Sequence, residues 1–224
     1  MKLLLFILSF YTFATHGQKK LDLESFHLLA RPDSVVTSTP DGIIYVTTDS
    51  NSKLYSWIVP KVETKFASAY STLLESFKKQ NPQPVKKHKI KNFPKSWNSV
   101  YSYKGKYYLY SPPDWSSNSG FYISESVIYI TSSDPSDLYV ITDCTVTSKF
   151  EASFNVVNYF GDAKHISIKA IKPEIGIYSW QIFDDNNNEE AQFIMQNSDL
   201  VKKLPMIVCD CGEKKCDLEF DFTN

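Results

Sequence analysis

Four cysteines carry the most reactive side chains of this chain, and three of them cluster near its C-terminus. Cys209, Cys211 and Cys216 are close enough in sequence for disulfide bonds or for part of a thiolate metal site. A tetrahedral zinc site needs a fourth ligand, which would have to be Cys144 or a distant histidine. Residues 1–17 have the pattern of a signal peptide, and in an exported protein disulfide bonds are the usual state of cysteine. We therefore expect disulfides, with a metal site or free thiols as the alternatives.

The pairing of these cysteines depends on a C-terminal β-hairpin, in which apolar and acidic residues alternate. If its turn takes the two residues midway between Cys211 and Cys216, these two cysteines lie opposite each other. Cys209 is then left to pair with Cys144. The same register puts Phe220 on the apolar face, so we expect its ring to pack against the barrel.

Histidines and carboxylates, the common acids and bases of catalysis, suggest no active site. His165 follows Asp162 by three positions, but Gly161 and Asp162 are more typical of a hairpin turn before a strand. A glycosidase-type site needs two converging carboxylates. The loop acids to inspect are Asp114, Asp134 and Asp137. We predict no catalytic residues, no metal, no cofactor and no enzymatic activity.

Aromatic residues are concentrated between Lys104 and Trp115, where the sequence is KGKYYLYSPPDW. Tyrosines and a tryptophan around an aspartate suit stacking on a sugar or on a flat apolar ligand. The alternative is structural: an aromatic strand followed by a loop whose tryptophan covers the end of the fold. Tyr108, Tyr110 and Trp115 are the candidate ligand contacts of this stretch.

Residues 1–17 have the pattern of a cleaved signal peptide, with Lys2, an apolar run from Leu3 to Ala14, and small residues before Gln18. The apolar run is shorter than the ~20 residues of a membrane span, and no later stretch is long enough. We expect an exported protein, periplasmic or extracellular, without a transmembrane segment. The net charge of −1 argues against a nucleic-acid partner. The sequence indicates no oligomeric state.

Residues 18–96 form an N-terminal region of strands, one helix and a basic segment. We predict a strand over Ser34–Thr37, and a hairpin that pairs Ile43–Thr48 with Lys53–Ile58. Apolar residues at helical spacing predict an amphipathic helix over Val62–Gln80. Two prolines follow it closely and end it.

The basic segment follows this helix. Its charged residues are Lys86, Lys87, His88, Lys89, Lys91 and Lys95. Such a patch can bind phosphate, an acidic glycan or anionic lipid. The alternative is a solvated linker, which the sequence favours because no aromatic residues are interleaved at binding spacing.

Residues 97–224 are predicted to form a β-barrel with a C-terminal hairpin, because short apolar/polar alternations follow one another from about Lys104 to Gln196. A short helical turn is expected over Asn197–Leu204. The strands begin near Lys106, Phe121, Val127, Leu138, Phe150, His165, Ile175 and Ala191. Such a meander has unpaired edges unless it closes, so we predict a mainly β fold with a roughly eight-stranded antiparallel barrel and a C-terminal hairpin.

One face of the predicted barrel strands is apolar and the other polar. The apolar face contains Leu138, Val140, Cys144, Val146, Phe150, Phe154, Val156, Phe160, Ile166, Ile168, Tyr178, Trp180, Ile182, Phe193 and Met195. A face rich in aromatic rings is what a ligand cavity in a barrel needs. The candidate ligand contacts here are Phe154, Tyr178, Trp180 and Phe193.

An eight-stranded meander behind a signal peptide resembles the calycin superfamily, which includes the lipocalins, over about residues 97–196 and in architecture only. The stretch from Gly105 to Trp115, together with 158–162, is similar to uncharacterised exported proteins of Bacteroidetes-type bacteria. We predict an exported, non-enzymatic binding module for a small apolar or amphipathic ligand. The alternative is a structural or interaction module of the bacterial cell envelope, with an envelope protein as partner.

Overall fold

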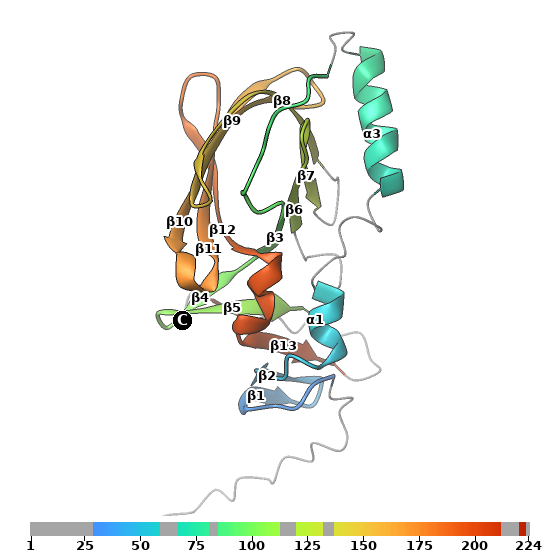
Figure 1. Ribbon diagram of the computed structural model, residues 1–224. Coiled ribbons are helices and arrows are strands. Elements are labelled where there is room, and N and C mark those ends of the chain that lie inside the picture. The colour runs from blue at the N-terminus through green and yellow to red at the C-terminus, as the bar shows by residue number, and fades with distance from the viewer. Residues whose placement is uncertain are drawn as a thin grey trace, which may run out of the picture.

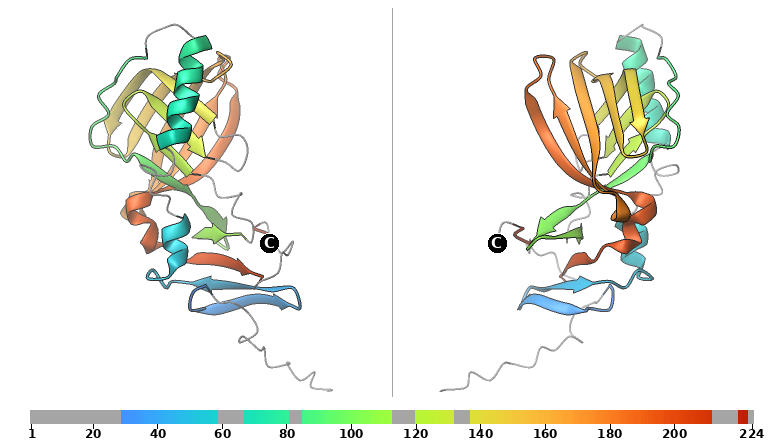
Figure 2. Two further views of the ribbon diagram at one scale, coloured as in Figure 1. Left: turned by 90° about the vertical axis from the view of Figure 1, so that its right-hand side faces the viewer. Right: turned by 60° about the vertical axis from the view of Figure 1, so that its left-hand side comes forward.

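The structure is a computed structural model that describes residues 29–58, 67–80, 85–112, 120–131, 137–211 and 220–222. It contains a closed antiparallel barrel and a five-stranded sheet next to one end of that barrel (Figure 1). The predicted signal peptide lies outside the described residues. Helix α3 runs beside the barrel, and the short helix α1 lies next to the sheet (Figure 2).

Eight strands close the barrel in the order β10-β11-β12-β3-β6-β7-β8-β9. Their bounds are β3 Ser96–Ser99, β6 Gly120–Ile123, β7 Val127–Thr131, β8 Asp137–Ser148, β9 Glu151–Val157, β10 Ala163–Lys172, β11 Ile177–Phe183 and β12 Glu189–Asn197. Strands β6 to β12 are consecutive along the chain, and β3 pairs with both β12 and β6 to complete the circle. The predicted mainly β fold with a closed eight-stranded barrel is confirmed.

One barrel strand differs from the sequence prediction. The strand that begins at Lys106, β5 (Lys106–Ser111), belongs to the five-stranded sheet, and β3 takes its place in the barrel. Only Trp97 among the four residues of β3 is a large apolar residue, so the segment has no alternation that could reveal a strand.

The five-stranded sheet is assembled from three distant parts of the chain, in the order β1-β2-β13-β5-β4. Its remaining strands are β1 Ser34–Thr39, β2 Gly42–Thr47, β4 Tyr101–Tyr103 and β13 Met206–Asp210. β13 is antiparallel to β2 and parallel to β5. The C-terminal part of the chain therefore joins the N-terminal hairpin to the hairpin β4–β5.

The predicted hairpin partner of β2 is wrong, because Lys53–Ile58 is helix α1 and β2 pairs with β1 instead. Leu54, Tyr55 and Ile58 lie on one side of this helix and are buried. They pack with Tyr45 of β2 in a core between the sheet, α1 and the barrel. The hydroxyl of Tyr55 also donates a 2.6 Å hydrogen bond to the carbonyl of Leu204.

The predicted amphipathic helix is present as α3, Ala67–Gln80, and the start of the predicted range lies outside the described residues. Phe77 of α3 packs with Leu138 and Val140 on the outside of the barrel. There are also two short 3-10 helices, η3 Pro173–Ile175 and η4 Ser198–Lys203. They precede β11 and β13, respectively.

A β-bulge in β8 changes which side chains face the barrel interior. The register shifts between Ile141 and Asp143, so Leu138 and Val140 face outward to α3, whereas Cys144 packs against the interior. The single apolar face predicted for this strand is therefore wrong. Two further members of the predicted face, Phe150 and Phe160, lie in turns and are 41% and 83% exposed.

Candidate functional site

The candidate ligand residues lie in two separate places. Phe154, Tyr178 and Trp180 are buried in the barrel core, and Phe193 packs against that core half-buried. Tyr108 and Tyr110 lie on β5, on the outer face of the five-stranded sheet. Trp115 lies outside the described residues. The candidate residues therefore define two sites, one in the barrel interior and one on the surface of the five-stranded sheet.

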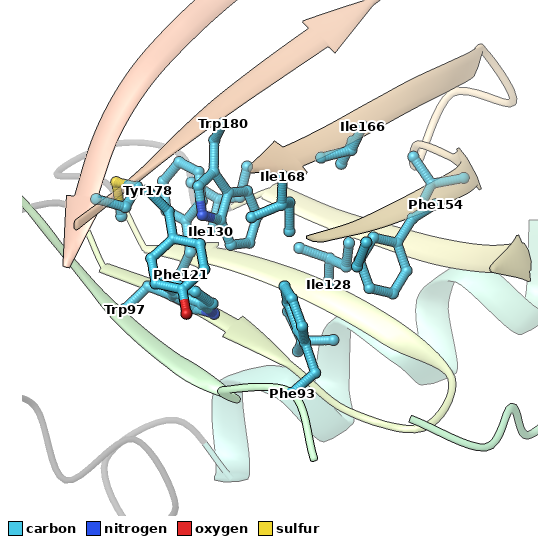
Figure 3. Close-up of a cluster of buried hydrophobic side chains, with 14 of the residues drawn as sticks. Phe93, Trp97, Phe121, Ile128, Ile130, Phe154, Ile166, Ile168, Tyr178 and Trp180 are labelled. Carbon is cyan, nitrogen blue, oxygen red and sulfur yellow. The ribbon is translucent and has the colours of Figure 1, made fainter. Parts of the chain in front are cut away.

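The barrel interior is filled by its own aromatic rings in the region of these candidates (Figure 3). Trp97 lies edge-on to Tyr178 and to Trp180, with ring centroids 4.7 and 5.4 Å apart. Phe121 lies 4.9 Å from Trp180 and 5.2 Å from Phe193. These spacings are those of rings in direct contact, so the candidates here serve as packing partners of one another.

Residues 85–95, here called the basic strap, complete this core instead of forming the solvated linker that the sequence favoured. Phe93 is buried with its ring 6.3 Å from that of Phe154, and Ile90 belongs to the same cluster. The backbone N–H of His88 donates to the carbonyl of Glu125, and its Nε2 lies 3.1 Å from the carbonyl oxygen of Ile141. The strap is therefore tied to β8 and to the β6–β7 turn.

Two indole N–H groups in this interior lack a partner in the described part of the chain. They belong to Trp97 and Trp180, whose side chains are fully buried. A buried donor without an acceptor costs about 1–3 kcal/mol. Sequence reasoning singled out Trp180 but missed Trp97, since its neighbours in sequence are polar.

The second place is an aromatic face on the outside of the five-stranded sheet. It consists of Tyr101, Tyr103, Tyr108, Tyr110, Phe220 and Phe222, each of them half-buried. Tyr101 stacks on Phe222 at 4.5 Å and 21°, and Tyr103 lies edge-on to Phe220 at 4.9 Å. Residues from a central hairpin and from the C-terminus thus form one continuous patch of rings.

Hydrogen bonds and a turn hold the aromatic face in position. The backbone N–H of Phe220 donates to the hydroxyl of Tyr110 at 3.1 Å, and that hydroxyl lies 3.5 Å from Cys209 Sγ. Lys104 and Gly105 both have positive φ, as in the tight two-residue turn of a β-hairpin. This turn sets Tyr101 of β4 opposite Tyr108 of β5.

Electrostatics leave the aromatic face largely uncharged. Burial raises the pKa of Tyr101, so its hydroxyl stays neutral at physiological pH. Lys104 Nζ lies 4.9 Å from the ring centre of Tyr103, at the rim of the face. Flat rings with a lysine at their rim can stack on an apolar ligand and contact its polar groups.

Sequence reasoning identified only part of this face. It selected Tyr108 and Tyr110 but missed Tyr101 and Tyr103 of β4, although the four tyrosines flank the Lys104–Gly105 turn at alternating positions. That spacing was a usable signal for a hairpin with tyrosines on one side.

The predicted bond between Cys144 and Cys209 is wrong. Cys144 lies in barrel strand β8 with a free thiol, whereas Cys209 lies in β13 of the other sheet. Burial, with the nearby carboxylate of Asp143, raises the pKa of the Cys144 thiol, which makes it less reactive. The pair Cys211 and Cys216 stays a prediction, since Cys216 lies outside the described residues.

The loop acids considered for catalysis stay a prediction, because Asp114, Asp134 and the side chain of Asp137 lie outside the described residues. His165 Nδ1 lies 2.9 Å from Asn155 Oδ1, and Asp162 accepts a hydrogen bond from Asn158 instead of facing the histidine.

The described residues contain no group of three or more His, Cys, Asp and Glu side chains placed to hold a metal ion. None of their helices has both the length and the apolar character needed to cross a membrane.

Comparison of the chain with protein-family models, with curated proteins and with solved structures finds no significant match in any of the three.

Proposed function

We propose that the protein is an exported, non-enzymatic binding module whose binding surface for a small amphipathic ligand is the aromatic face. The observation that carries this proposal is the contact of six half-buried rings on the outside of a sheet. Monomeric proteins bury most of their aromatic area, so a continuous patch of rings that is only half-buried on the outside of a sheet favours a binding role. Export is inferred from the signal-like pattern of residues 1–17.

The barrel interior is the weaker candidate for the ligand. Trp97 and Trp180 are 0% exposed, and their rings touch those of Tyr178 and Phe121. A ligand there would have to displace side chains that pack against one another, at a cost in core stability. The ligand assigned from sequence to the barrel is therefore moved to the outer face of the neighbouring sheet.

The ligand should have a flat apolar side and a polar rim. The rings offer flat faces, and the ammonium of Lys104 lies beside the ring of Tyr103 at their rim. A sugar ring or a planar aromatic compound has this chemistry.

The test is titration with N-phenyl-1-naphthylamine, a neutral apolar probe whose fluorescence rises on binding. We compare wild type with Tyr101→Leu, which removes one ring of the face but keeps an apolar side chain. Phe193→Leu is the matched control, because it removes one ring that packs against the barrel core. Loss of one stacking ring, worth about 0.5–1.5 kcal/mol, should weaken binding by roughly 2- to 10-fold.

The outcomes distinguish the aromatic face from the barrel interior as the binding site. The proposal holds if Tyr101→Leu weakens probe binding and Phe193→Leu leaves it unchanged. Weaker binding in Phe193→Leu with wild-type binding in Tyr101→Leu would return the ligand to the barrel. Absence of any fluorescence increase with wild type would contradict a small-ligand role for either place.

An envelope protein as partner remains the second candidate, and strand β1 favours it. β1 is an outer strand of its sheet, its side chains at positions 34–37 are exposed, and its sequence SVVTST has no charged residue. Exposed outer strands without lysine or proline readily pair with another chain. Val35→Lys should abolish any such pairing, seen as loss of a complex in crosslinked envelope fractions, whereas Tyr101→Leu should not.

A further inference from the structure

Phe160 is an apolar side chain held out into solvent at the tip of the β9–β10 turn. It is 83% exposed, about twice as much as Phe150 at the other end of β9. Its position is fixed, because Asn158 Oδ1 accepts hydrogen bonds from the backbone N–H groups of Phe160 and Asp162, at 3.0 and 2.8 Å. The backbone N–H of Asn158 in turn donates to the carbonyl of Asp162. The turn therefore holds an apolar ring in solvent in a fixed position.

Lysines lie next to this turn. Gln80, the last residue of α3, donates from Nε2 to the hydroxyl of Tyr159 at 2.6 Å, and Val85 of the basic strap packs in the same cluster as Tyr159. Two pairs of exposed lysines lie next to Gln80 and Val85 in the sequence. They are Lys78 and Lys79 of α3, and Lys86 and Lys87 of the strap.

These lysines belong to a markedly basic part of the chain. Positions 78–95 contain seven of its 24 basic residues and no acid. Lys87 makes a 3.8 Å ion pair with Glu125. Because both side chains are well exposed, this ion pair neutralises little of the positive charge of the surface. The strap carries its lysines on a backbone that Ile90 and Phe93 anchor in the barrel core.

The acidic residues of this end fall into two groups. Asp162 lies in the Phe160 turn and Glu125 beside the strap, whereas four others lie in the β11–β12 hairpin. Asp184, Asp185 and Glu189 belong to the β11–β12 hairpin, and Glu190 there pairs with Lys164. This hairpin and α3 stand on opposite sides of the upper end of the barrel (Figures 1 and 2). The exposed lysines of α3 and the strap therefore outnumber the two acids near Phe160, whereas the β11–β12 hairpin is acidic.

We propose that this end of the barrel is a docking surface for a bilayer with anionic headgroups. Phe160 would enter the interface, while the four lysines of α3 and the strap would lie against the headgroup phosphates. The exposed ring favours a bilayer over a soluble polyanion, which would bind the lysines but offer no apolar phase. The acidic hairpin would be repelled, so the barrel would dock tilted, with α3 closest to the surface.

The test is co-sedimentation of the purified protein with vesicles. Vesicles of phosphatidylcholine mixed with phosphatidylglycerol supply the negative charge, and pure phosphatidylcholine vesicles are the reference. We expect binding to the charged vesicles only, with a strong decrease as salt is added. Glycerol 3-phosphate in excess should not release the protein, since a free phosphate offers no place for Phe160.

Two pairs of test and control variants identify the residues that contact the bilayer. Phe160→Ala should reduce partitioning about tenfold, whereas Phe150→Ala, at the opposite end of β9, should leave it unchanged. Lys86→Gln with Lys87→Gln should reduce it about fivefold per lysine, whereas Lys202→Gln with Lys203→Gln on η4 should not. All six positions are on exposed residues, so the variants should keep the wild-type fold, checked by circular dichroism.

Three results would overturn the proposal. The first is failure of the wild-type protein to bind charged vesicles. The second is equal loss in test and control variants. The third is sensitivity to the lysine changes but not to Phe160→Ala, together with release by glycerol 3-phosphate, which would identify a soluble anion as the ligand.

Discussion

The ring of Phe93 lies 5.7 Å from the indole of Trp97, which places a residue of the basic strap inside the barrel. The two residues are four positions apart, yet Phe93 precedes the first barrel strand and Trp97 belongs to it. The strap is thus part of the barrel core, and its exposed lysines are carried by a fixed backbone.

The first prediction concerns this contact. Phe93→Ala should lower the free energy of unfolding by about 3–5 kcal/mol, because it leaves a cavity in a core of aromatic rings. Lys91→Ala, two residues away and exposed, should change it by no more than about 0.5 kcal/mol. Urea unfolding followed by tryptophan fluorescence measures both. Equal midpoints in the two variants would mean that the strap does not enter the barrel.

The second prediction concerns pH. Burial raises the pKa of Tyr45 and of Tyr55 to about 12, from an ordinary value of 10.0. Folding favours the neutral hydroxyl of both tyrosines. Their contribution to the free energy of unfolding is therefore constant below pH 10 and is lost as the pH rises from about 10 to about 12. Each tyrosine should account for about 2 kcal/mol of this loss.

The variants Tyr45→Phe and Tyr55→Phe test this assignment. Each should cost about 1 kcal/mol at pH 7, where the hydroxyls bond to the backbone of Ala30 and Leu204. The double variant should lose less stability than wild type between pH 7 and pH 11, measured as the shift of the urea midpoint. A parallel loss in both proteins would show that other groups dominate alkaline unfolding.

The sequence was informative where each strand carries its own alternation. β9 shows this most clearly, since Ala152, Phe154 and Val156 are buried and the residues between them are not. Such a pattern is local, so β6 to β12 and the closure of their barrel could be anticipated. Helix α3 was found for the same reason, by the spacing of its apolar residues.

Features that depend on partners far along the chain were missed. The pairing of β13 with both β2 and β5 leaves no mark on any one of these segments. The bulge near Thr142 that reverses the facing of β8 has no sequence signature either. Of the aromatic face, the tyrosines of β5 were found, but the packing of Phe222 on Tyr101 joins positions too distant to be paired from sequence.

The third prediction concerns Gly176, which follows η3 with φ of +70°. A Cβ at this position would lie 2.8 Å from Leu200 Cδ1, so Gly176→Ala combines backbone strain with a clash against η4. We expect a loss of about 2–3 kcal/mol in the free energy of unfolding, since left-handed alanine alone costs about 1–2 kcal/mol.

Gly105 is the matched control, because its φ is +73° but nothing lies within 4 Å of its Cβ position. Gly105→Ala should show the strain alone, about 1 kcal/mol. In a Leu200→Ala background the cost of Gly176→Ala should fall to the same value. If Gly176→Ala costs no more than Gly105→Ala in the wild-type background, the Leu200 side chain turns away from the new Cβ and the contact with η4 adds nothing to the backbone strain.

The last prediction concerns the C-terminus, which was expected to pack against the barrel and instead lies on the five-stranded sheet. Phe222→Ala removes a ring that stacks on Tyr101 and lies edge-on to Tyr110 at 5.2 Å. Since the ring is only half-buried, the loss should be about 1–2 kcal/mol, less than for a fully buried phenylalanine. Ser102→Ala, at the exposed position between Tyr101 and Tyr103, should change stability by no more than about 0.5 kcal/mol.

Urea unfolding of the two variants beside wild type measures this difference. Because the same rings form the proposed binding surface, Phe222→Ala should also weaken binding of N-phenyl-1-naphthylamine, while Ser102→Ala should leave it intact. A drop in stability without a change in binding would show that Phe222 only covers the sheet. Identical midpoints in all three proteins would mean that the C-terminal residues do not rest on Tyr101 at all, and the aromatic face would then consist of the β4–β5 tyrosines alone.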